Sequence, residues 1–127
     1  MLDQVRHVLD NPRFSALFSP GSRAEVSIVG RLQRDNGAIA VSGQADRLVV
    51  TPDAVLIADY KTNDPAPRRI EDVPTAYVTQ LALYRAVLSQ LYPGKTIRTL
   101  LVWTEVPDLM EISAPSLDAA LSAVTSA

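Results

Sequence analysis

Residues 41–62 read VSGQADRLVVTPDAVLIADYKT, and this stretch decides the predicted fold. Two apolar runs flank the dipeptide Pro52-Asp53, which is typical of a turn. The second run, AVLIA, is unbroken, as expected of a central strand that is covered on both faces. The stretch therefore predicts two adjacent strands, residues 38–51 and 54–62, joined by a tight turn.

The neighbouring segments alternate between strand and helix patterns. Residues 24–33 alternate apolar and polar side chains, and the turn signal DNG at residues 35–37 joins them to the strand 38–51 as a hairpin. Residues 75–91 carry apolar side chains at helical spacing and predict the longest helix. Helical segments are predicted at residues 2–10 and 14–18, and a polar loop at residues 63–74. Two further strands are predicted at residues 96–105 and 109–113, followed by a final helix at residues 116–124 with Ser116 as its N-cap. This order predicts an α/β fold in which helices flank a mixed β-sheet.

The composition fits one folded domain. The chain has 127 residues, 47% of them hydrophobic and 20% charged, so a packed core is expected. It has no cysteine, which excludes disulfides, thiolate zinc sites and cysteine nucleophiles. No apolar run long enough to cross a membrane and no signal peptide is visible, so a cytoplasmic protein is expected. The net charge of −2 is unusual for a strong autonomous DNA binder, so other contributors to DNA affinity are expected.

A candidate site lies where the two strands of residues 41–62 would meet. Asp59 and Lys61 are two residues apart on one strand, so their side chains point to the same face. Asp46 lies six residues before Pro52, and Asp59 lies six residues after Asp53. A symmetric hairpin would bring the two carboxylates to the same height on neighbouring strands.

Two adjacent carboxylates repel each other and favour a bound cation. Mg²⁺ prefers such hard oxygen ligands, with Mn²⁺ as a substitute. Lys61 would lie beside the reacting water or phosphate, where it could help to deprotonate or position the water, or stabilise the transition state. The alternative interpretation is an ordinary surface salt bridge between Asp59 and Lys61.

Three blocks of sequence carry a resemblance to a known family. The blocks GQADRL (43–48), IADYKT (57–62) and YVTQLALY (77–84) resemble the RecB-family branch of the PD-(D/E)XK nucleases, in particular the C-terminal nuclease domains of AddA-type helicase–nucleases. The likeness covers about residues 22–112. It implies a restriction-endonuclease-like core, Mg²⁺-dependent exonuclease activity on DNA, a function in double-strand-break repair and recombination, and an AddB-type partner subunit.

The resemblance also implies roles for the residues that match these motifs. Asp46 and Asp59 match the two metal-binding carboxylates, and Lys61 matches the catalytic lysine. The backbone carbonyl of Tyr60 is implied as a further metal ligand.

Gln80 and Tyr84 match a Q-x-x-x-Y motif of the same family. Four residues apart on a helix, they share a face and would reach toward the site and the DNA backbone. For Tyr84 the alternative is core packing with an exposed hydroxyl. Gln80 interrupts an apolar face, which favours the functional interpretation.

The resemblance is incomplete before the first strand. The family usually has a histidine or an acidic residue there, in a segment like G-x-x-x-H, which this chain lacks. His7 and Glu25 are the candidates for this contribution, and a solvated or packing role is the alternative for His7. We expect residues 1–127 to be a single nuclease-like domain, a C-terminal fragment of a larger helicase–nuclease. Without the first nuclease helix, the fragment could be inactive.

Two other classes of protein compete with a nuclease. A non-catalytic nuclease-fold module that docks a partner subunit or DNA would explain the negative charge and the missing histidine motif, and it predicts no saturable metal binding. A different hydrolase is disfavoured, because the chain has one histidine, no cysteine and no metal-spaced histidine cluster. No Walker A pattern occurs, so P-loop ATP hydrolysis is not expected.

Overall fold

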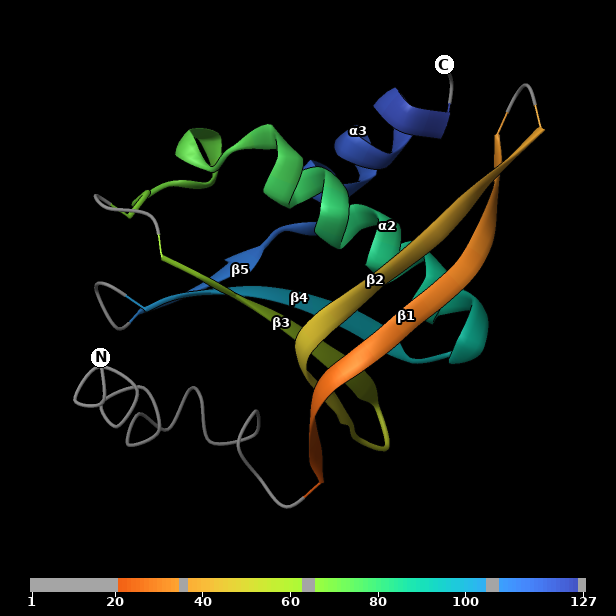
Figure 1. The fold of residues 1–127 in the computed structure, drawn as a ribbon, viewed down its shortest axis with the longest axis horizontal. Coiled ribbons are helices and arrows are strands. Elements are labelled where there is room, and N and C mark those ends of the chain that lie inside the picture. The colour runs from red at the N-terminus through yellow and green to blue at the C-terminus, as the bar shows by residue number, and fades with distance from the viewer. Residues whose placement is uncertain (1–20, 35–36, 63–65, 105–107, 126–127) are drawn as a thin grey trace.

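The computed structural model describes residues 21–34, 37–62, 66–104 and 108–125. Five strands form one sheet in the order β1-β2-β3-β4-β5 (Figure 1). Neighbouring strands are antiparallel except for β3 and β4, which are parallel. The elements are β1 Ser22–Arg34, β2 Gly37–Val50, β3 Ala54–Lys61, the 3₁₀ turn η2 Ile70–Asp72, α2 Thr75–Leu91, β4 Thr96–Trp103, β5 Asp108–Ile112 and α3 Ala114–Thr125.

A tight hairpin joins β2 to β3. The amide of Thr51 donates to the carbonyl of Ala54 at 2.8 Å, and the Thr51 hydroxyl bonds both the carbonyl and the amide of Ala54 at 3.0 Å. Val50 therefore pairs with Val55, and the register continues in step away from the turn. The hairpin is symmetric about residues 52 and 53, as the turn residues predicted.

The parallel pair of β3 and β4 requires a crossover connection, and α2 provides it. α2 packs across one face of the sheet with α3 beside it (Figure 1). Gly30 of β1 lets α2 approach closely, because a β-carbon there would lie 2.8 Å from Cγ1 of Val87. Buried side chains of the sheet and α2 form the main core beneath this helix: Ile28, Leu32, Val41, Ala45, Leu48, Val55, Ile57, Tyr84, Val87, Leu88 and Ile97.

The opposite face of the sheet is also apolar. Its buried cluster consists of Val49, Ala58, Leu100, Val102 and Leu109. β3 and β4 thus carry apolar side chains on both faces, which explains their unbroken apolar runs.

The alternation of side chains along β2 reverses near Asp46. Ala45 and Leu48 both belong to the core beneath α2, although they are three residues apart, and Val49 lies on the opposite face. Across from Asp46 in the register, Glu25 has a left-handed backbone with φ of 53° and drops out of the β1–β2 pairing. Regular strand geometry is therefore interrupted at the same height in both β1 and β2.

The element bounds predicted from the sequence are confirmed to within two residues for the strands and helices that the structure describes. The predicted loop contains the short turn η2. Ser116 as N-cap is wrong: α3 begins at Ala114, because Pro115 is tolerated in a first helical turn, and Ser116 bonds the Ser113 hydroxyl at 3.0 Å. The helical segments predicted at residues 2–10 and 14–18 lie outside the described residues. Neither helix in the described ranges has the length and apolar character needed to cross a bilayer.

Candidate functional site

Asp46 and Asp59 come together where β2 and β3 stop pairing. The last paired residues are Arg47 and Ala58, and the same register places Asp46 opposite Asp59. There the side chain of Asp46 replaces a backbone carbonyl as the hydrogen-bond acceptor: its Oδ2 accepts a hydrogen bond from the amide of Tyr60 at 2.7 Å. The two strands can therefore separate at this point without leaving that amide unbonded.

Asp59 is buried and its carboxylate is unsatisfied. The residue is 2% exposed, and neither carboxylate oxygen has a hydrogen bond of good geometry among the described residues. Burial raises the pKa of Asp59 above its usual value, the charge of Lys61 lowers it, the charge of Asp46 raises it, and a weak hydrogen-bonding contact with the backbone of Asp46 lowers it. Native proteins rarely leave a buried carboxylate without a partner, since its desolvation is costly.

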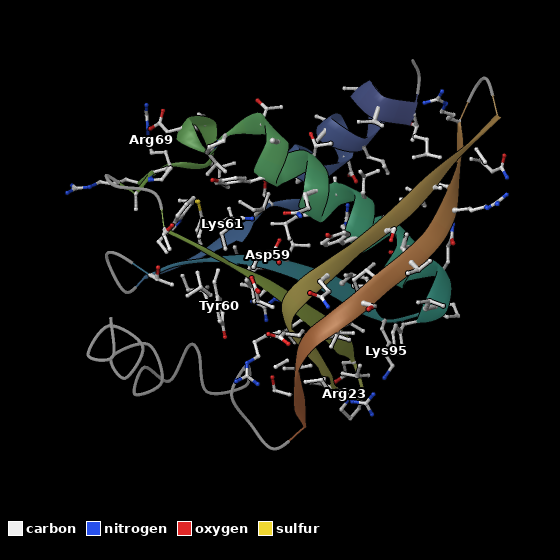
Figure 2. The ribbon with its side chains drawn as sticks, in the orientation of Figure 1. Arg23, Asp59, Tyr60, Lys61, Arg69 and Lys95 are labelled. Carbon is white, nitrogen blue, oxygen red and sulfur yellow. The ribbon has the colours of Figure 1, made fainter. Side chains whose placement is uncertain are left out.

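The ammonium of Lys61 has three neighbours. Its Nζ lies 3.9 Å from Oδ2 of Asp59 and donates to Oε1 of Gln80 at 3.3 Å. The ring of Tyr77 lies below it, with the ring centroid 4.5 Å from Nζ. Figure 2 shows Asp59 and Lys61 on the side of β3 that faces α2, with Tyr60 projecting to the other side. A side chain of β3 is thus oriented by two side chains of α2.

Gln80 and Tyr84 extend this network along α2. Nε2 of Gln80 donates to the hydroxyl of Tyr84 at 3.2 Å, so a continuous chain of contacts runs from Lys61 to Tyr84. The Tyr84 hydroxyl occupies the space above Gly43, where a β-carbon would overlap it and lie 2.8 Å from Cζ. Gly43 therefore makes room for the last member of the network.

The structure brings together five side chains that the sequence singled out: Asp46, Asp59, Lys61, Gln80 and Tyr84. Tyr84 packs within the core at 4% exposure, as the packing alternative predicted, and its hydroxyl bonds Gln80; a contact with DNA stays a prediction. The amide of Tyr60 contacts Asp46, and its hydroxyl accepts a hydrogen bond from Nε of Arg47 at 3.3 Å.

Of the two candidates for a further ligand, only Glu25 lies among the described residues, and it is not brought to the site. Glu25 is exposed, despite its position opposite Asp46 in the register. Across the described ranges, no three histidine or acidic side chains lie close enough to hold a metal ion together. His7 lies outside the described residues.

Two neighbours of the site were missed by sequence reasoning. Tyr77 lies three residues before Gln80, and this helical spacing was the available signal that both could face Lys61. Gly43 was quoted as part of a motif without a reason for its being glycine. Its contact with Tyr84 joins residues far apart in the sequence, so no local pattern could reveal it.

The carboxylates suit a hard divalent cation. Asp59 presents two oxygens without hydrogen bonds, and Asp46 uses only Oδ2 in its contact with Tyr60. Mg²⁺ in proteins is commonly held by one or two carboxylates, with water completing the shell. A cation here would also neutralise the repulsion between Asp46 and Asp59.

The chain resembles known nucleases in sequence. The family model of the PD-(D/E)XK nuclease superfamily matches residues 3–119. An ATP-dependent helicase/nuclease subunit of Lactiplantibacillus plantarum is 32% identical over 98 residues, which make up 72% of this chain but 7% of that protein. The crystal structure of SSO0001 is 15% identical with a TM-score of 0.49, covering 94% of this chain and 54% of that one, and this likeness is too weak to support an argument.

Proposed function

The chain belongs to the PD-(D/E)XK nuclease superfamily, and from this premise we propose that it is a Mg²⁺-dependent deoxyribonuclease domain of the exonuclease type. The likeness to a helicase/nuclease subunit supports the further proposal that residues 1–127 form one nuclease-like domain of a larger helicase–nuclease. In this proposal the complex repairs DNA double-strand breaks in the cytoplasm and contains an AddB-type partner subunit.

The buried carboxylate of Asp59, which lies beside Asp46 and has no hydrogen bond of good geometry, is the observation that carries the proposal. An acid used only for stability would be expected to bond a partner, as Asp46 bonds the amide of Tyr60. In this proposal a cation completes the site that the two carboxylates form at the same height on neighbouring strands.

Each residue of the network has a task in the proposed reaction. Asp46, Asp59 and the carbonyl of Tyr60 would hold the cation, which would polarise the scissile phosphate and acidify a water molecule. Lys61 directs a positive charge toward the same space and stabilises negative charge that develops on the phosphate oxygens. Gln80 orients Lys61 through its amide oxygen, and Tyr84 fixes the amide of Gln80.

The proposal is tested by calorimetric titration of the chain with Mg²⁺ and Mn²⁺. We expect saturable binding by the unmodified chain and a loss of affinity of about 100-fold in Asp46→Asn, because one of two carboxylate ligands is removed. Asp53→Asn is the matched control, since Asp53 is an exposed acid on the turn between β2 and β3. No saturable binding by the unmodified chain, or equal affinities for both variants, would contradict the proposal.

A non-catalytic nuclease-fold module is the second candidate. The lack of a third acidic or histidine ligand within the ranges that the structure describes favours it. This candidate predicts that neither cation binds saturably and that Lys61→Ala leaves the binding of DNA unchanged. The titration above therefore distinguishes the two functions directly.

A further inference from the structure

The aromatic ring of Tyr77 faces the ammonium of Lys61, and this ring has no role in the proposed reaction. We propose that Tyr77 is a positioning residue, which holds Lys61 away from Asp59 and so keeps the Asp59 carboxylate available to a cation. This inference deepens the proposed nuclease function and rests on it for the part that concerns the cation.

The contact is a cation–π interaction in geometry. Nζ of Lys61 lies 4.5 Å from the ring centroid of Tyr77, within the range over which a lysine is attracted to a ring face. The Lys61 side chain is 19% exposed, so the contact is largely shielded from water and from the screening that weakens surface contacts.

The ring of Tyr77 is itself held from the sheet. Trp103 packs against it with ring centroids 6.3 Å apart and an interplanar angle of 42°. Trp103 is 1% exposed and pairs with Lys61 across the parallel strands β3 and β4. The ring and the ammonium that it faces are therefore anchored to the same point of the sheet.

The ammonium of Lys61 does not form a direct hydrogen bond with Asp59. A lysine beside a buried carboxylate is expected to form a direct hydrogen-bonded ion pair, because its long side chain is flexible and the attraction is strong where water is excluded. Instead, Nζ stays 3.9 Å from Asp59 and bonds Gln80. Tyr77 and Gln80, one helical turn apart on α2, together draw the ammonium toward the helix.

Without the ring, Lys61 would lose one of the two contacts that oppose its attraction to Asp59. The ammonium would then close onto the carboxylate and compete with a cation for the same oxygens. Tyr77 thus separates two tasks in one small site: Asp59 binds metal, and Lys61 keeps its charge free for the substrate.

The experiment uses the full chain labelled with ¹³C-lysine, in which NMR detects only Lys61 and Lys95. A ring below the ammonium displaces the ε-methylene proton signals of Lys61 upfield, whereas Lys95, which bonds the carbonyl of Thr51 at 2.6 Å, serves as the internal reference. Lys61→Arg assigns the two signals. If the Lys61 signals are not displaced upfield relative to those of Lys95 in the unmodified chain, the proposal is overturned without any variant.

Two variants at Tyr77 separate its ring from its other contacts. Tyr77→Phe keeps the ring, so we expect the displaced Lys61 signals to be retained. Tyr77→Leu removes the ring, so we expect the displacement to be lost while unchanged Lys95 signals report an intact fold. A merely structural role would not make the Lys61 signals depend on the presence of a ring.

Titration with Mn²⁺ tests the consequence for the cation. We expect Tyr77→Leu to weaken Mn²⁺ binding about tenfold, as supporting residues around metal ligands commonly do, and Tyr77→Phe to restore it. Equal Mn²⁺ affinity in the Leu variant and the unmodified chain would overturn the role of Tyr77 in freeing Asp59. If the unmodified chain binds no Mn²⁺, the proposed nuclease function fails and this role of Tyr77 fails with it, whereas the NMR measurement still decides whether the ring holds Lys61.

Discussion

The sheet carries two acid–base pairs, the buried pair Asp59–Lys61 and the exposed pair Glu111–Arg98. They differ in how closely their charged groups approach and in whether these groups form hydrogen bonds. Arg98 donates two hydrogen bonds to Glu111, at 3.1 Å from Nε and 2.6 Å from Nη2. This contact lowers the pKa of Glu111 and raises that of Arg98. In the buried pair the charged atoms are 3.9 Å apart, and burial raises the pKa of Asp59.

Under the proposed function, this difference separates a contact that serves the fold from a carboxylate that binds a cation. Glu111 and Arg98 use their polar atoms on each other and add little to stability, because both remain in contact with water. Asp59 has no hydrogen bond of good geometry and approaches Lys61 only to 3.9 Å, although the surrounding core would strengthen a closer contact. Such an unsatisfied group costs stability and persists where function requires it.

The largest effect is expected from Asp59→Asn, which removes the unsatisfied charge. Binding of Mg²⁺ and Mn²⁺ should fall by about 100-fold or more, since the proposed function makes Asp59 a metal ligand. The metal-free chain should become more stable by about 1 kcal/mol, because a neutral amide is cheaper to bury than an ionised carboxylate. Titration calorimetry and urea unfolding measure the two effects, and a variant that loses stability as well as affinity would contradict this account of Asp59.

Two glycines, Gly30 and Gly43, lie beneath α2 and leave room for its side chains. Gly43→Ala and Gly30→Ala should each destabilise the chain by about 1–3 kcal/mol, because a β-carbon would press on Tyr84 in one case and on Val87 in the other. The Gly43 variant alone should also move the NMR signals of Lys61, since Tyr84 reaches Lys61 through Gln80.

Combining Gly43→Ala with Tyr84→Phe checks the cause of that effect. Removing the hydroxyl relieves the closest overlap, so the double variant should lose less stability than the sum of the two single variants. Strict additivity in urea unfolding would show that the hydroxyl does not depend on the space above Gly43.

The two acids should respond to pH with opposite signs. The folded-state pKa of Asp59 lies above its ordinary value of 3.8, so its stability contribution is fully present below that pH and is lost as pH rises through the folded-state pKa. The folded-state pKa of Glu111 lies below 4.5, so its contribution is present above that pH and is lost as pH falls through the folded-state pKa. Urea unfolding between about pH 3 and 7 should show that Asp59→Asn removes the first dependence and Glu111→Gln the second. A variant profile parallel to that of the unmodified chain would contradict the corresponding assignment.

The smallest effect is expected from Arg98→Ala. Its free energy of unfolding should fall by less than about 1 kcal/mol, and by less still at high salt, because the ion pair with Glu111 is exposed. Cation binding should not change, since β4 and β5 hold this pair away from Asp46 and Asp59. Any loss of Mn²⁺ affinity in this variant would show that the two pairs are coupled.

Much of the fold could be predicted because its signals are local. The bounds of α2 follow from helical spacing between Thr75 and Leu91, and the pairing of β2 with β3 follows from the turn at residues 52 and 53. The prediction of Ser116 as N-cap was wrong because serine carries only a local capping signal, whereas Pro115 is accommodated in the first turn and α3 begins at Ala114. The placement of both described helices on one face of the sheet needed tertiary contacts between α2 and α3.

The candidate site divides in the same way. Local sequence patterns predicted which side chains lie close together. Alternation along a strand places Asp59 beside Lys61, and the turn places Asp46 opposite Asp59. Helical spacing places Gln80 beside Tyr84. Each of these relations depends on residues close along the chain or on a single tight turn.

The burial and the neighbouring groups of those side chains depend on tertiary contacts. The burial that raises the pKa of Asp59, the ring of Tyr77 below Lys61 and the space above Gly43 all arise where α2 crosses the sheet. Burial and close approach depend on volumes contributed by elements distant in sequence, whereas periodicity depends on backbone geometry alone. The sequence therefore specified five side chains of the candidate site, and packing determined that Tyr77 and Gly43 adjoin them and that Asp59 lacks a hydrogen bond of good geometry.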